Sequence, residues 1–173
     1  MRTDRVVVVP YDESWPCEFE KIKNELLPAA GKYLVAVEHV GSTSVGGLPA
    51  KPIIDLDAVI PDYGCFAAVR RELSRIGYRH EGCLGIRDRE AFAYSGKPHL
   101  TTHHLYVCPQ NSEELRRHLL FRDYLRSHPE EARHYGEVKR EAAALFPNDI
   151  DAYLEYKSPC VREILKKAGR EKE

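Results

Sequence analysis

The stretch HVGSTSVGGLPAKPIIDLD, residues 39–57, constrains the fold more than any other part of the chain. An apolar segment ends at Gly41-Ser42, a loop rich in glycine, serine and threonine follows, and a second apolar segment carries Asp55 and Asp57. Both apolar segments are predicted strands. Because side chains alternate between the two faces of a strand, the two aspartates share one face, about 7 Å apart. This pattern predicts a sheet with two neighbouring carboxylates on one face.

The remaining hydrophobic periodicity predicts an α+β chain. Further short apolar runs predict strands at 6–9, 33–40, 52–60, 78–81, 91–94 and 102–107. Apolar residues at helical spacing predict helices at 15–30 and 66–76 and three more after residue 112. We expect the last helix to be interrupted at Ser158-Pro159, because a proline ring donates no helical hydrogen bond. The expected architecture is one domain over residues 1–173. Its core of about 6–108 is a mixed β-sheet with flanking helices, and about 112–168 form a C-terminal helical cap.

Charge and composition exclude several classes of protein. The chain has 26 Lys and Arg residues against 27 Asp and Glu residues, a net charge of −1, so nucleic acid is not the expected partner. No run approaches the ~20 apolar residues of a membrane-spanning helix. Five scattered cysteines without a C-x-x-C pair indicate free thiols in a reducing compartment. We therefore expect a cytoplasmic protein, and the sequence leaves its oligomeric state open.

The loop after the first strand has the composition of a phosphate-binding loop. Gly41 permits close approach of the backbone, and the loop offers N–H groups and the hydroxyls of Ser42, Thr43 and Ser44 to phosphate oxygens. Lys51, near the start of the second strand, adds a positive charge. A plain turn is the alternative interpretation of such a loop.

The two aspartates are candidate metal ligands. Mg²⁺, or Mn²⁺ in its place, is usually held by one or two carboxylates together with substrate phosphates. Burying carboxylates without a cation or partner is costly, so Asp55 and Asp57 need one or the other. The alternative is a structural salt bridge to Lys51 or to an arginine. Taken with the adjoining loop, the spacing favours a site for phosphate and metal.

The arrangement G-S-x12-D-h-D resembles the signature of the nucleotidyltransferase superfamily, which has a DNA polymerase beta-like fold. The longer set of segments resembles one branch, the GrpB family, from about Val8 to Leu165. These segments are EHVGSTSVGGLPAKPIIDLD, VPYDESWPCEFEKIKNEL before it, and HHLYV, HLLFRDYLRSHPEEARHYGEVK and YLEYKSPCVREIL after it. The GrpB family also occurs fused to dephospho-CoA kinase in some bacteria.

The resemblance implies roles for individual residues. Gly41 and Ser42 would hold phosphate, while Asp55 and Asp57 would be catalytic metal ligands for Mg²⁺ bridging a triphosphate. In the superfamily, a third carboxylate on a later strand positions or deprotonates the attacking hydroxyl. The corresponding strand here, THHLYV, contains no acidic residue. His104 is therefore the candidate general base or additional metal ligand, because imidazole titrates near neutral pH.

Other residues are candidates for lining the substrate pocket: His39, Arg87, Arg89, His103 and Lys157. Arg87 and Arg89 suit phosphate or carboxylate, which guanidinium binds through two hydrogen bonds. Lys139 or Lys157 could reach the pocket from the helical cap. The alternatives are a solvated hairpin for the arginines and a solvated helix face for the lysines. For His103, which lies near other histidines, core hydrogen bonding competes with a role in a site.

Three functions follow from these patterns. The first is a Mg²⁺-dependent nucleotidyltransferase that binds a nucleoside triphosphate and transfers a nucleotidyl group to a small-molecule or protein acceptor. The second is a non-catalytic module that binds a nucleotide or cofactor, linked to coenzyme A metabolism, which the missing third carboxylate favours. The third is an interaction scaffold in which salt bridges retain the aspartates. We favour them in this order.

Overall fold

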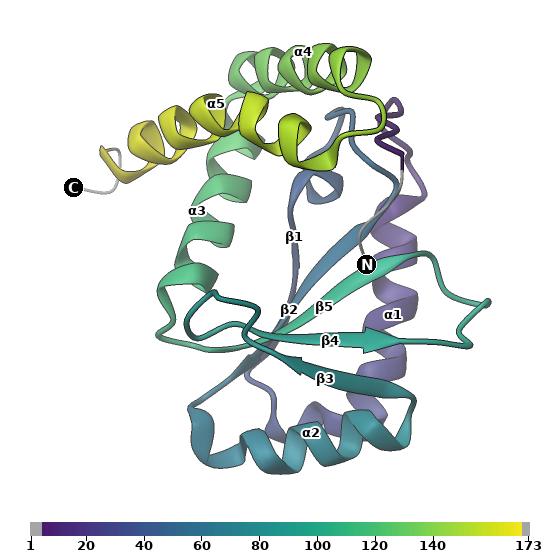
Figure 1. Cartoon of the computed structure of the whole chain (residues 1–173). Coiled ribbons are helices and arrows are strands. Elements are labelled where there is room, and N and C mark those ends of the chain that lie inside the picture. The colour runs from purple at the N-terminus through teal and green to yellow at the C-terminus, as the bar shows by residue number, and fades with distance from the viewer. Residues whose placement is uncertain (1–4, 171–173) are drawn as a thin grey trace.

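The computed structural model describes residues 5–170 and contains a sheet surrounded by helices (Figure 1). The helices are α1 (Trp15–Ala30), α2 (Phe66–Arg75), α3 (Glu113–Ser127), α4 (Pro129–Leu145) and α5 (Ile150–Arg170). The strands are β1 (Ala36–Val40), β2 (Ile54–Ile60), β3 (Tyr78–Gly82), β4 (Glu90–Tyr94) and β5 (His103–Pro109). The α+β class is confirmed.

The sheet is mixed, with strand order β1-β2-β5-β4-β3. The central pair, β2 and β5, is parallel, whereas every other neighbouring pair is antiparallel. In the parallel register Asp55 lies beside His104 and Asp57 lies beside Tyr106. The strand that carries the aspartates is therefore next to the histidine-containing strand.

The two faces of β2 have different environments. Its alternate residues Ile54, Leu56, Ala58 and Ile60 are buried in one apolar cluster with side chains of α1 and α2. This alternation places Asp55 and Asp57 on the opposite face. Near the far end of that face, Val59 packs with Leu115 of α3. The sequence pattern thus positions both carboxylates away from the main core.

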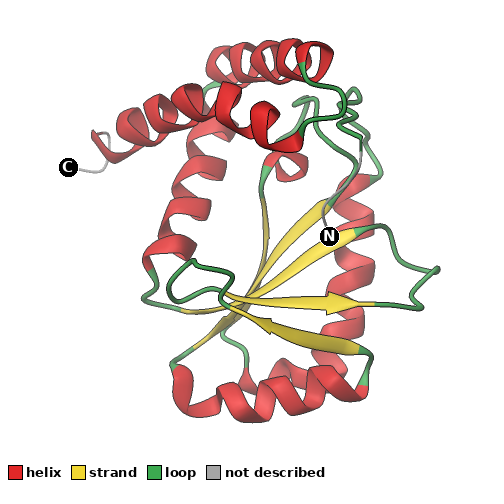
Figure 2. Ribbon diagram, viewed as in Figure 1, coloured by secondary structure: helices red, strands yellow, loops and turns green. Residues whose placement is uncertain are grey.

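The last three helices form a cap. Residues of α3, α4 and α5 share an apolar cluster, which also includes Val45 and Leu48 from the loop between β1 and β2. Figures 1 and 2 show α4 and α5 across the end of the molecule where this loop lies, at the top of the view. The cap is therefore packed onto the predicted phosphate-binding loop.

Residues 6–9 do not form the predicted strand. Val9 alone pairs, through two backbone hydrogen bonds of 2.9 and 3.0 Å with Ala50. Upstream, the Val6 N–H donates to Pro147 O, and the Val6 side chain packs with Ala142 and Tyr153 of the cap. The apolar run is explained by this contact with the cap.

The predicted interruption at Pro159 is also wrong, because α5 continues through it. A proline in a helix leaves the carbonyl four residues earlier without its donor. Here that residue is Glu155, and both Glu155 and Pro159 are exposed, so water can satisfy the carbonyl. Within residues 5–170, the helices are too short or too polar for any of them to span a membrane. All five cysteines are free.

Candidate functional site

Gly41 brings the loop between β1 and β2 against the first aspartate. Its φ is +71°, in the left-handed region that favours glycine, and a Cβ atom at this position would lie 2.5 Å from Oδ2 of Asp55. The following residues, Ser42–Ser44, form a 3₁₀ turn, in which Ser44 Oγ donates to Gly41 O over 2.6 Å. Both the tight turn and the close approach therefore require glycine.

A hydrogen bond between His39 of β1 and Thr43 stabilises this turn. His39 Nε2 lies 2.9 Å from Thr43 Oγ1, and the imidazole stacks on Phe19 of α1 with ring centroids 4.7 Å apart. Burial lowers the pKa of His39 to about 4, so the ring is neutral at neutral pH. The hydroxyls of Thr43 and Ser44 thus bond within the loop region, and Ser42 is the serine of the turn that lines the adjoining cavity.

Each aspartate of β2 is hydrogen-bonded to a histidine. His104 Nδ1 lies 2.8 Å from Asp55 Oδ1, as the strand register allows. His118, from α3, places its Nδ1 2.6 Å from Asp57 Oδ2. Asp57 is fully buried, and its second oxygen, Oδ1, has no hydrogen-bond partner in the described part of the chain. One carboxylate oxygen of Asp57 is thus buried without a hydrogen-bond partner among the described residues.

His118 is the functional candidate that the sequence reasoning missed. Its Nε2 also lies 3.2 Å from Oε1 of Glu114, one turn earlier on α3. Burial disfavours the charged imidazole, but the hydrogen bonds to Asp57 and Glu114 outweigh it and raise the pKa of His118 to about 9. The hydrogen bond from His118 lowers the pKa of Glu114 to about 2. The sequence signal was the i,i+4 pair of Glu114 and His118, which alone does not reveal contact with a strand.

Arg89 approaches the same aspartate from the connection between β3 and β4. Its guanidinium carbon lies 4.3 Å from the centre of the Tyr106 ring, and Tyr106 is beside Asp57 in the strand register. Burial raises the pKa of Asp57, and the charges of His118 and Arg89 act against this rise. The Nε of Arg89 is buried and has no hydrogen-bond partner among residues 5–170. Arg89 thus joins the site near Asp57.

A cavity of about 150 Å³ lies beside Asp55, between the loop and the cap. Three lysines line it: Lys51 before β2, Lys139 on α4 and Lys157 on α5. Lys157 Nζ donates to Tyr135 OH over 3.3 Å, and Lys139 Nζ donates to the carbonyl of Pro49. None of the three lysines forms an ion pair with a described residue, and Asp55 supplies the carboxylate of the cavity wall. The cavity is therefore rich in basic side chains, with Asp55 as its carboxylate.

The lysine environment is strongly desolvated. Lys139 is 2% exposed, and burial together with the charges of Lys157 and Arg140 lowers its pKa to about 6. Burial also lowers the pKa of Lys51 and of Lys157, while the negative charge of Asp55 acts in the opposite direction on both. Keeping ammonium groups in such a place is unfavourable without a negative partner. An anionic ligand would supply that partner.

Close packing of α4 on the loop brings Lys139 into the cavity. A Cβ atom on Gly136 would lie 2.9 Å from Cδ of Pro49, so only glycine permits this contact without a shift. Lys139 follows three residues later and lies on the same side of the helix. The helix face that carries Gly136 and Lys139 thus seats the cap on the loop.

Two predicted pocket residues lie elsewhere. His103 faces the opposite side of β5 from His104. Its Nε2 lies 2.8 Å from Tyr78 OH, its Nδ1 lies 2.7 Å from Thr101 O, and burial lowers its pKa to about 4. The side chain of Arg87 is 94% exposed on the connection between β3 and β4. The structure therefore gathers His39, Arg89, His104 and Lys157 around the loop and the aspartates, but neither His103 nor Arg87.

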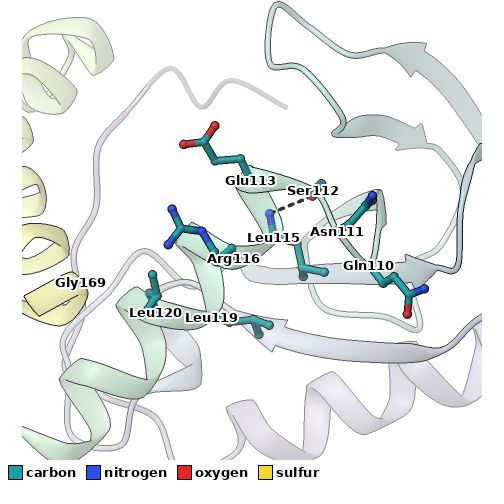
Figure 3. A pocket seen from close by; sticks show the side chains of 9 residues that line it. All are labelled: Gln110, Asn111, Ser112, Glu113, Leu115, Arg116, Leu119, Leu120 and Gly169. Carbon is teal, nitrogen blue, oxygen red and sulfur yellow. Dashed lines mark hydrogen bonds between the residues drawn. The ribbon is translucent and has the colours of Figure 1, made fainter. Parts of the chain in front are cut away.

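A larger groove of about 580 Å³ lies away from the aspartates, between the start of α3 and the end of α5. Figure 3 shows its wall, where the Leu115 N–H donates to the capping hydroxyl of Ser112 over 3.1 Å. The charged side chains that line it are Glu113 and Arg116, which have opposite signs. The smaller cavity, with its three lysines and Asp55, has the more distinctive chemistry.

The aspartates suit a divalent cation that arrives with a substrate. Within the described range, no three His, Cys, Asp or Glu side chains are grouped closely enough to hold a metal ion by themselves. Asp57 Oδ1 is nevertheless buried without a hydrogen-bond partner among residues 5–170, and Asp55 lies at the cavity wall. Because Mg²⁺ can be held by two carboxylates plus substrate phosphates, this donor set fits the ion when phosphate oxygens complete it.

Comparison with known proteins agrees with the arrangement of loop, strand and cap. The family model described as GrpB protein matches residues 5–167. The chain belongs to the GrpB family. The crystal structure of the conserved protein GrpB from Enterococcus faecalis has a TM-score of 0.79 and 35% identity. The match covers 93% of this chain and 98% of that one.

Relatives differ in length. The chain is 33% identical over 166 residues to YqkA of Bacillus subtilis, but spans only 48% of that protein's length. It is 32% identical to the glutamate-rich protein GrpB of Alkalihalophilus pseudofirmus, which it matches over 94% of the length. A dephospho-CoA kinase of Mycolicibacterium paratuberculosis is 28% identical over 94% of this chain and 46% of the kinase. The GrpB domain therefore occurs in proteins about twice as long.

The likeness extends to nucleotidyltransferases at the level of fold. A crystal structure of the Cid1 poly(U) polymerase bound to MgATP has a TM-score of 0.52 at 12% identity. The match covers 76% of this chain and 45% of that chain. At this identity the comparison concerns the fold alone, which is nucleotidyltransferase-like, as the resemblance to the superfamily signature implied.

Proposed function

We propose that the protein is a Mg²⁺-dependent nucleotidyltransferase. It binds a nucleoside triphosphate by its phosphates and transfers the nucleotidyl group to a hydroxyl of a small molecule or protein. The observation that carries this proposal is the placement of three lysines, which form no ion pair with any of residues 5–170, around a cavity beside Asp55 and the Gly41 turn. Lys51, Lys139 and Lys157 offset the negative charge of the phosphates.

The side chains at β2 and β5 suit the transfer step. The acceptor oxygen would attack the α-phosphorus, the bond from that phosphorus to the bridging oxygen would break, and pyrophosphate would leave. His104 lines the cavity and is hydrogen-bonded through Nδ1 to the Asp55 carboxylate. Its Nε2 therefore carries the lone pair that would take the hydroxyl proton. Mg²⁺ held by Asp55 and Asp57 would stabilise charge on the phosphate oxygens.

The lysines suit the leaving group. When pyrophosphate departs, negative charge builds up on the oxygen that bridged the α- and β-phosphates. Ammonium groups held in a desolvated cavity stabilise such charge more strongly than water does, and a bound anion favours the protonated form of Lys139. Lys139 and Lys157 are fixed there by Pro49 O and by Tyr135 OH. The cap would thus contribute to catalysis by binding the leaving group.

A specific observation favours a second candidate function, a non-catalytic module that binds a nucleotide or a cofactor related to coenzyme A. In the strand register, the residues beside the two aspartates are His104 and Tyr106, so β5 carries no third carboxylate. The occurrence of a matching segment in a dephospho-CoA kinase supports the same alternative.

Release of pyrophosphate separates the two candidates. We expect the protein to release pyrophosphate from a nucleoside triphosphate with Mg²⁺ and a mixture of small hydroxyl acceptors. We expect Asp57→Asn to reduce the rate at least about a hundredfold, because a buried metal ligand is lost. The control is Asp62→Asn, at an exposed position where asparagine keeps the oxygen that accepts from the Gly64 N–H. Tight binding without pyrophosphate release would favour the binding module.

A further inference from the structure

We infer that the site recognises the polyphosphate and not the nucleobase, so that its ligands are nucleoside triphosphates of any base and inorganic tripolyphosphate. This inference rests on the proposed function, because it specifies the substrate class of the same cavity. It follows from three properties of the cavity: its size, its charge and the chemistry of its walls.

The cavity is too small to enclose a nucleotide. Its volume is about 150 Å³, whereas sites that enclose drug-sized ligands measure about 300–1,000 Å³. The residues that line it come from the Gly41 turn, from β2 and from the cap helices. The space between them is of a size for phosphate groups. The nucleoside of a bound triphosphate would therefore extend outside the cavity.

The charge of the cavity matches a polyanion. Lys51 and Lys157 supply positive charge, Lys139 adds to it when a bound anion favours its protonation, and Asp55 is the carboxylate on the wall. Lys139 is almost completely buried, with a backbone carbonyl and the face of the Tyr135 ring, 4.6 Å away, as its neighbours. When all three lysines are protonated, the cavity carries two positive charges net of Asp55, so a single negative charge would leave one of them unbalanced. Affinity should therefore increase with the number of phosphates.

The walls offer little that could distinguish one base from another. Base selection needs side chains that match the hydrogen-bonding edge of the base, or an aromatic face on which the base stacks. Within the described part of the chain, no Asn, Gln or Trp side chain lines the cavity. The aromatic residues that line it are Tyr135 and Tyr153, each 2% exposed.

The ring of Tyr135 is already occupied. The Nζ of Lys139 lies over it, Phe121 packs nearly perpendicular to it with ring centroids 5.4 Å apart, and its hydroxyl accepts from Lys157. The Tyr153 ring is equally buried, with Lys157 Nζ 5.8 Å from its centre, so neither lining tyrosine offers a base a free face. Discrimination between bases should be weak.

Isothermal titration calorimetry of the whole protein with Mg²⁺ tests this inference. The probes are the four ribonucleoside triphosphates, inorganic tripolyphosphate, pyrophosphate, phosphate and adenosine. We expect the four triphosphates and tripolyphosphate to bind with dissociation constants within about threefold of one another. Each phosphate removed from tripolyphosphate should weaken binding at least about tenfold, because hydrogen bonds to charged groups are lost. Adenosine should not bind.

Two lysine variants and a matched control test whether the phosphates bind at the cavity lysines. Lys139→Met and Lys157→Met should weaken binding of tripolyphosphate and of all four nucleotides by the same factor, at least about tenfold. Lys166→Met, at an exposed position on α5, should leave all affinities unchanged. The wild-type series tests the inference even if a variant does not fold.

Other outcomes overturn the inference in distinguishable ways. One nucleotide binding more than tenfold tighter than the others, with no binding of tripolyphosphate, would overturn base-independent recognition and leave the proposed function in place. Loss of affinity confined to one nucleotide in the lysine variants would also overturn it. Absence of binding by every phosphorylated probe would remove the proposed function together with the inference.

Discussion

At the scale of single residues, the site depends on polar groups that are buried before any ligand arrives. Asp57 keeps one unpartnered carboxylate oxygen within the described residues, and Lys139 is buried without an acidic partner among them. Such groups reduce the stability of the folded state. Their cost is explained if a ligand carrying a cation and several negative charges binds both.

Lys139 makes the stability of the ligand-free protein depend on pH. Its pKa is about 6 in the folded state, against an ordinary lysine value of 10.5. Between these values the unfolded chain binds more protons, so the free energy of unfolding should rise with pH by up to about 1.4 kcal/mol per pH unit from this group. In Lys139→Met this contribution is absent, while Lys157 and Arg140 remain.

Urea denaturation at intervals from pH 6.5 to 9 measures this difference. The free energy of unfolding of the wild type, relative to Lys139→Met, should increase by at least about 1 kcal/mol over this range. The comparison with the variant cancels other titrating groups, including His118, whose raised pKa contributes stability that is lost as pH rises toward 9. Parallel pH profiles would show that Lys139 is charged in the folded protein.

At the scale of elements, the seating of α4 on the loop links the cap to the site. Replacing Gly136 by alanine places a Cβ atom 2.9 Å from Cδ of Pro49, so α4 or the loop must shift. We expect Gly136→Ala to cost about 1–3 kcal/mol of unfolding free energy, as overpacking does. It should also weaken tripolyphosphate binding, because Lys139 moves with the helix.

The matched control is Gly169→Ala on α5, where a Cβ atom would meet nothing within 4 Å. This substitution should raise stability by about 0.5–1 kcal/mol through helix propensity and leave binding unchanged. Urea denaturation and calorimetry measure both effects. If Gly136→Ala binds tripolyphosphate as tightly as the wild type, the cap does not contribute to the site in this way.

Some elements were predictable because their signal is local. Alternation along residues 54–60 predicted that both aspartates share one face. Residues 6–9 and Pro159 were predicted wrongly because packing against the cap and exposure to water decided their conformation. Local propensity includes neither effect.

At the scale of the whole molecule, the candidate site joins segments that are far apart in sequence. Helix α3 brings His118 to Asp57, 61 residues away, and helix α4 brings Lys139 to Pro49, 90 residues away. Sequence patterns identified the loop and the aspartates. For Lys157 they left two alternatives open, a place in the pocket and a solvated helix face. The contact of His118 with Asp57 was not predictable, because it depends on how the cap packs on the sheet.

The central claim is that the loop, the aspartates and the cap lysines form one phosphate–metal site. Its most direct test is thermal unfolding with a nucleoside triphosphate, with and without Mg²⁺, of the wild type and of the Asp55→Asn/Asp57→Asn double variant. A ligand at 100 times its dissociation constant stabilises by about 2.7 kcal/mol, which for a chain of this length raises the Tm by several degrees. We predict this rise for the wild type with Mg²⁺ and its loss in the double variant. An equal rise in the double variant, or none in the wild type, would contradict the account.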